Sequence, residues 1–236
     1  MEKANNKKID IESVADILEN IYGKAISGAT LISPPIENVA ESYLKKYSSP
    51  AIAAKKMLNN QVLKCTTSGF VTGLGGVITL AATLPLNITS VIYVQVRMIA
   101  CTAYMAGYDL NDDQVQTLVY ACLAGVAVNE LIKNAGLKFG EKIAVNIIKK
   151  IPGEVFTKIN QKIGFRFITK FGEKGIINMG KLIPGVGGVI GGGFDLIETR
   201  IIANRAYRWF FENDFSVNNA KDDEADFIDV GEAEEK

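Results

Sequence analysis

The sequence contains no histidine, which removes the commonest general base and the commonest metal ligand of proteins. It has only three cysteines, Cys65, Cys101 and Cys122, and no two of them have the CxxC spacing of a metal or redox site. Each lies in an apolar stretch, so we expect buried thiols. Their odd number favours a reducing compartment. The polar N-terminal segment also lacks the apolar run of a secretory signal, so we expect a cytoplasmic protein.

The two glycine runs lack the motifs of nucleotide-binding loops. Residues 73–78 and 185–190 both read G-x-G-G-V-I. Neither is followed by Lys-Ser/Thr, and Ile78 and Ile190 stand where the dinucleotide motif needs its third glycine. The GxSxG motif of serine hydrolases is absent as well. We therefore expect no cofactor, no metal site and no catalytic residue, and the sequence favours a protein that is not an enzyme.

The formal net charge of zero hides an uneven distribution. Residues 217–236 contain eight acids and two bases, whereas the other 216 residues carry 24 bases and 18 acids. A basic body indicates an anionic partner, and the acidic tail either competes for the same surface or only keeps the chain soluble. We assign residues 1–9 to a disordered N-terminus, 10–213 to one helical domain and 217–236 to a disordered acidic tail.

Apolar residues recur with a 3.6-residue period, and no long stretch alternates with period two. The pattern predicts an all-α fold, a compact multi-helix domain with a glycine-rich apolar helical hairpin. Cap and stop signals at Asp10, Pro35, Ser49-Pro50, Gly107 and Asn111-Asp112 set the helix ends. One helix is expected over 112–135, and the last one ends near Phe211.

A segment of 32 residues, 65–96, carries no charge. A bilayer-spanning helix needs about 20 apolar residues, so length alone makes the segment a membrane candidate. Its glycines and Pro85 instead predict two closely packed helices that meet near Leu84-Pro85 and reach about Ala106. Such a hairpin suits either a globular core or a membrane, because small residues allow close helix packing in both.

A basic region follows, with eleven bases and three acids between residues 133 and 181. Five of its bases are four residues apart and so share one broad helical face. These are Lys158, Lys162, Arg166, Lys170 and Lys174. A basic amphipathic helix is typical of a lipid surface or an acidic partner, and it also occurs as the solvated face of a packed helix. No nucleic-acid-binding module accompanies it, so we expect no specific nucleic acid.

Four polar residues form a second candidate site: Arg97, Asp109, Asp195 and Thr199. Arg97 is the first charge after the uncharged segment, and Asp195 follows a glycine run one helical turn before Thr199. A carboxylate in such a place must be paired if it is buried. The site is therefore either an ion pair that fixes helix register or part of a pocket that binds or acts on a lipid.

Several motifs, in order, resemble the EcsC family over roughly residues 50–212. They are Gly73-Leu74-Gly75-Gly76, Leu84-Pro85, Gln95-x-Arg97, Gly107-Tyr108-Asp109-Leu110, Ile183-Pro184 and Phe194-Asp195. The resemblance implies a helical bacterial protein with a membrane-linked context, because the family is named for an operon that also encodes an ABC transporter. It implies no defined reaction. Ala81-Ala82-Thr83 departs from the family pattern, in which an acid is common there.

These observations predict a non-enzymatic EcsC-like protein that associates with the cytoplasmic membrane or a membrane transporter. Its partner would be a membrane lipid or a membrane protein, and its place would be peripheral to, or inserted at, the inner face of that membrane. Two alternatives stay open. One is a lipid-binding or lipid-acting protein with a pocket near Arg97 and Asp195, and the other is a membrane-perturbing toxin or immunity-type protein. The oligomeric state is open.

Overall fold

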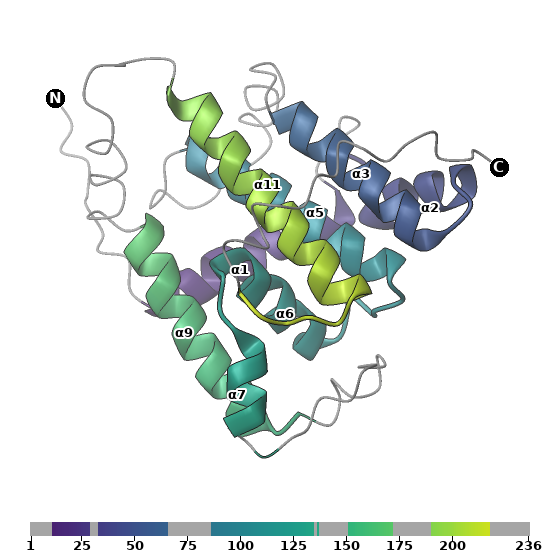
Figure 1. Ribbon diagram of the computed structural model, residues 1–236. Helices are drawn as coiled ribbons and strands as arrows, with labels where there is room; N and C mark the ends of the chain where they lie inside the picture. Colours follow the sequence, from purple (N-terminus) through teal and green to yellow (C-terminus); the bar gives the residue numbers. More distant parts are fainter. Residues whose placement is uncertain are drawn as a thin grey trace, which may run out of the picture.

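The computed structural model describes residues 11–28, 33–65, 86–134, 136, 151–171 and 190–217. These residues form eight α-helices and no β-strand, which confirms the all-α prediction (Figure 1). In chain order they are α1 (Ile11–Ser27), α2 (Ile36–Lys46), α3 (Pro50–Cys65), α5 (Leu86–Met105), α6 (Asp113–Ala124), α7 (Val128–Asn134), α9 (Gly153–Phe171) and α11 (Ile190–Phe211). The predicted tails, 1–9 and 217–236, lie outside the described residues except for Val217.

The starts of α3 and α6 and the end of α5 fall where the capping residues predict them. The Ser49 hydroxyl accepts a hydrogen bond from the backbone N–H of Ile52 at 3.3 Å, at the start of α3. Asp112 accepts one from the N–H of Gln114 at 2.9 Å and so caps α6. Side-chain oxygens at this position satisfy N–H groups that the first helical turn leaves without partners. Gly107, with φ +88°, follows the end of α5 in the left-handed conformation that glycine tolerates best.

Helix α5 forms the centre of the fold. It packs against α1, α2, α3, α6 and α11 (Figure 1). Between residues 89 and 105 every side chain except those of Val91, Arg97 and Tyr104 is buried. The last third of the uncharged segment, residues 86–96, is therefore part of a core helix. Residues 66–85 lie outside the description, so the predicted hairpin remains a prediction.

Among the helices of the described ranges, none combines the length and the apolar character that crossing a bilayer requires.

The helix predicted over 112–135 is interrupted, so that prediction was wrong. Helix α6 ends at Ala124, Gly125 adopts φ +65° and ψ +40°, and α7 begins at Val128. A left-handed residue ends the helical hydrogen-bond pattern, and the freed carbonyls are satisfied by a tight turn. Here the N–H of Gly125 bonds to the carbonyl of Cys122 at 3.2 Å, and that of Val126 to the carbonyl of Ala121 at 2.9 Å.

After α11 the chain folds back along the helix it has just left. Asn213 takes φ +56°, and Arg208 then pairs with the Asp214 carboxylate at 2.7 Å. The fully buried indole of Trp209 donates to the carbonyl of Ser216 at 2.9 Å. These contacts bring Val217, the last residue described, back beside α11.

Two glycines provide a matched test of this backbone geometry. Gly125→Ala should lower the free energy of unfolding by about 1–2 kcal/mol, because alanine is strained at positive φ. Its Cβ would also approach the Arg205 Nη1 to 3.3 Å. Gly23→Ala, exposed inside α1 with nothing within 4 Å, should instead stabilise by about 0.5–1 kcal/mol. Urea denaturation measures both, and equal shifts of the two midpoints would contradict the assigned backbone at Gly125.

Candidate functional site

Helix α9 carries the predicted basic face. Its apolar residues are buried, and the helix packs against α1, α6 and α7. They are Val155, Phe156, Ile159, Ile163 and Phe167. Lys158, Lys162 and Arg166 are exposed, as the four-residue spacing predicts. Lys170 lies within α9 but its side chain is not described, and Lys174 lies outside the described residues.

An aromatic side chain shares this exposed face and was missed in the sequence. Phe165 is 70% exposed, although large apolar side chains are normally buried. With 3.6 residues per turn, Phe165 and Arg166 lie on either side of Lys162 within an arc of about 100° on α9. The sequence could have predicted this exposure, because Phe165 does not follow the 3.6-residue period of the buried apolar residues of α9. We call Lys158, Lys162, Phe165 and Arg166 the basic-aromatic face.

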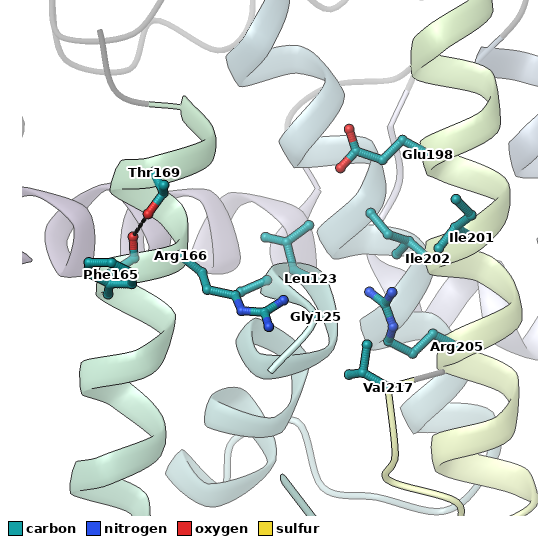
Figure 2. A pocket seen from close by; sticks show the side chains of 11 residues that line it. Leu123, Gly125, Phe165, Arg166, Thr169, Glu198, Ile201, Ile202, Arg205 and Val217 are labelled. Atoms are coloured by element: carbon teal, nitrogen blue, oxygen red, sulfur yellow. Dashed lines mark hydrogen bonds between the residues drawn. The ribbon is translucent and has the colours of Figure 1, made fainter. Parts of the chain in front are cut away.

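A cavity of about 500 Å³ lies beside this face, between α9, α11 and the end of α6. Its lining residues are Leu123, Ala124, Gly125, Phe165, Arg166, Thr169, Glu198, Ile201, Ile202, Arg205 and Val217. Figure 2 shows Arg166 reaching from α9 toward α11, while Glu198 and Arg205 project from α11 at opposite ends of the opening. The volume falls within the range of small-molecule sites. The sequence did not predict this cavity.

Two arginines converge at the lower end of the cavity. Arg205 is only 6% exposed and donates from Nη1 to the carbonyl of Cys122 at 3.0 Å. A Cβ placed on Gly125 would lie 3.3 Å from the Arg205 Nη1 and 3.4 Å from the Arg166 Nη1. Both guanidinium groups therefore approach the same point, which the missing side chain of Gly125 leaves open. The helix break at Gly125 is thus part of the cavity's geometry.

The second predicted site is distributed over the molecule. Arg97 faces the α1–α2 connection, where it donates to the carbonyls of Ala25 at 2.6 Å and Pro34 at 2.5 Å. Asp109 is exposed and accepts from the N–H of Asn111 at 2.9 Å, in the turn before α6. Thr199 is fully buried and receives a hydrogen bond from Gln95 at 3.2 Å. The described contacts therefore do not bring these three residues together.

The fourth member, Asp195, lies in α11, and its side chain is not described. Beside Arg97 there is a cavity of only about 10 Å³, which is about the space of one water molecule. The guanidinium of Arg97 also lies 5.7 Å from the ring centre of Tyr93. Its described contacts are those of a residue that holds α1, α2 and α5 together.

The two cysteines whose side chains the structure describes are buried, as expected: Cys101 is 3% and Cys122 is 0% exposed. Cys65 ends α3, and its side chain is not described. Burial raises the pKa of the Cys101 thiol to about 12, so the thiol stays protonated and is a poor nucleophile at neutral pH. Within the described ranges, no three cysteine or carboxylate side chains are grouped as a metal ion would require.

Comparison with known proteins identifies the family. The model of the EcsC protein family matches residues 34–210, which is most of the chain. The protein therefore belongs to the EcsC protein family, as the motifs indicated. No curated protein and no solved structure gave a match.

Arg97 provides a test of its structural role. Arg97→Met should lower the free energy of unfolding by about 2 kcal/mol, because two backbone carbonyls lose a charged donor. Arg97→Lys should lose roughly half as much, since an ammonium group cannot span both carbonyls as a planar guanidinium does. Urea denaturation measures both variants, and a stability unchanged in Arg97→Met would contradict this role.

Proposed function

We propose that this EcsC-family protein binds the surface of an anionic membrane through the basic-aromatic face of α9. The observation that carries the proposal is the exposed Phe165 among exposed bases, on a helix whose opposite side is buried. A merely solvated helical face explains Lys158 and Lys162 but gives no reason for an aromatic ring that is 70% exposed. Basic residues beside an aromatic ring are typical of helices that lie in the membrane interface.

The expected energies suit reversible, peripheral binding. Each Lys or Arg near an anionic membrane surface contributes about 1 kcal/mol, and the three exposed bases together contribute about 3 kcal/mol. Inserting the Phe165 ring adds about 1–2 kcal/mol of apolar burial. Part of this attraction is screened by salt, because the charges are exposed. Binding at low ionic strength that weakens in high salt is the behaviour that follows.

The first test neutralises the two lysines. Lys158→Gln with Lys162→Gln should weaken binding to vesicles of phosphatidylcholine and phosphatidylglycerol about 30-fold, as the loss of about 2 kcal/mol requires. Vesicle flotation at low salt measures it. The matched control is Lys45→Gln with Lys46→Gln, the same charge change on exposed positions of α2.

Comparing the two double variants distinguishes binding through the face of α9 from binding that depends only on net charge. Equal weakening by both would mean that binding depends on overall charge and would contradict a role for α9. Absence of flotation by the unaltered protein would contradict membrane binding itself. Dye release from the vesicles on binding would instead favour the membrane-perturbing alternative.

The acidic tail provides a second test. Val217 lines the same cavity as Phe165 and Arg166, so the acidic segment begins beside the basic-aromatic face. Deleting residues 218–236 removes a net charge of −6 and should strengthen vesicle binding at low salt several-fold, with the gain disappearing in high salt.

A neutral tail of the same length distinguishes the effect of the tail's charge from the effect of its size. Replacing its eight acids by Asn and Gln should strengthen binding as much as the deletion does. If the neutral tail binds like the unaltered protein, the tail acts only by its size or its solubility, and the competition is refuted.

A further inference from the structure

We infer that the cavity between α6, α9 and α11 binds one monoanionic amphiphile, with its phosphate or carboxylate group held between Arg166 and Arg205. The inference deepens the proposed function, on which it rests for the source of the ligand, because a membrane beside α9 would supply such molecules. The cavity would bind one lipid molecule, whereas the basic-aromatic face would attract the protein to the membrane surface.

The convergence of the two guanidinium groups points to an anion. Each has a terminal nitrogen within 3.4 Å of the position that a Cβ on Gly125 would take, so the two nitrogens lie close enough together for one phosphate or carboxylate group to accept hydrogen bonds from both. Within the described part of the chain, Arg166 has no hydrogen-bond or ion-pair partner. Two like charges held this close repel each other, and a bound anion removes the repulsion.

The surroundings of Arg205 hold its side chain in place. Its guanidinium is fixed by the carbonyl of Cys122 at 3.0 Å, and the residue as a whole is 6% exposed, so an ion pair formed there is less screened than one at the surface. Arg166 lies on the exposed side and completes the site from α9 (Figure 2). Arg205, buried and held in place, together with the exposed Arg166 suits an anion that enters from solvent or from a membrane.

The remaining wall of the cavity is largely apolar, which points to a chain attached to the anion. Phe165, Ile201 and Val217 contribute exposed or half-buried apolar surface to it, whereas Leu123 and Ile202 are already buried beneath. A free inorganic anion would leave these surfaces in water, whereas an acyl chain would cover them. A volume of about 500 Å³ suits a headgroup with the first part of a chain.

Glu198 limits the charge of the ligand. Its carboxylate also lines the cavity, at the end away from Arg205 (Figure 2). This carboxylate repels a second negative charge on the ligand, so a monoanion, such as a phosphodiester or a carboxylate, suits the lining better than a dianion does.

The test measures binding of short-chain lipids that stay monomeric in water. Dihexanoylphosphatidylglycerol should bind with one molecule per chain in isothermal titration calorimetry. Dihexanoylphosphatidylcholine, which has the same chains but no net charge, and inorganic phosphate, which has no chain, should each bind at least tenfold more weakly. Equal binding of the two lipids would overturn the anion specificity. Equal binding of inorganic phosphate would overturn the amphiphile and assign the site to a small free anion.

Two variants on the exposed side of α9 test the site without disturbing the core. Arg166→Gln should weaken binding of dihexanoylphosphatidylglycerol at least tenfold. Thr169→Trp should abolish it by filling the cavity without a change in charge. The matched control is Thr157→Trp, because Thr157 is also exposed on α9 and also donates to the carbonyl four residues earlier, but does not line the cavity.

Combining the two assays separates the cavity from the membrane surface. Thr169→Trp should still float with anionic vesicles, whereas Lys158→Gln with Lys162→Gln should still bind the short-chain lipid. Failure of the unaltered protein to bind any short-chain lipid, with flotation intact, overturns the cavity inference alone. Lipid binding without flotation contradicts the proposed function and leaves the cavity standing. Unchanged lipid binding in both Thr169→Trp and Arg166→Gln would show that the ligand binds elsewhere.

Discussion

The burial of α5 by five neighbouring helices is the packing constraint on which the rest of the structure depends. Its side chains from Thr89 to Met105 are almost all enclosed, and the helix carries no charge before Arg97. Such a helix cannot be stable alone in water, because most of its surface is apolar. Arg97 meets the carbonyls of Ala25 and Pro34, so the first charge of α5 also anchors α1 and α2 around it.

The position of α9 follows from this arrangement. Helices α1 and α6 both pack against α5, and both also contact α9, which therefore forms an outer layer with only one side buried. The break at Gly125 ends α6 early and leaves space between α9 and α11. The basic-aromatic face and the cavity are thus neighbours because the same helix borders both. The two features are chemically consistent, because both would bind negatively charged lipids: the face would bind a membrane surface, and the cavity a single amphiphile.

Local sequence signals predicted the helices and several of their ends. Ser49 and Asp112 act as caps because side-chain oxygens there satisfy free N–H groups, an effect that needs no tertiary contact. The four-residue spacing also placed Lys158, Lys162 and Arg166 on one exposed face. The break at Gly125 was missed because a lone glycine is tolerated within many helices, and its left-handed conformation depends on the surrounding packing. The cavity could not be predicted, since Arg166 and Arg205 belong to different helices, α9 and α11, whose relative position no local pattern reveals.

The orientation of the protein on a membrane is the central claim, and tryptophan fluorescence measures it directly. The chain has one tryptophan, Trp209, which is fully buried and gives a constant background. Phe165→Trp places a reporter on the basic-aromatic face, and Leu63→Trp places one at a comparably exposed apolar position on α3. With anionic vesicles containing brominated lipids, the account predicts a blue shift and quenching at position 165 and neither at position 63. Quenching at position 63 without quenching at position 165 would contradict it.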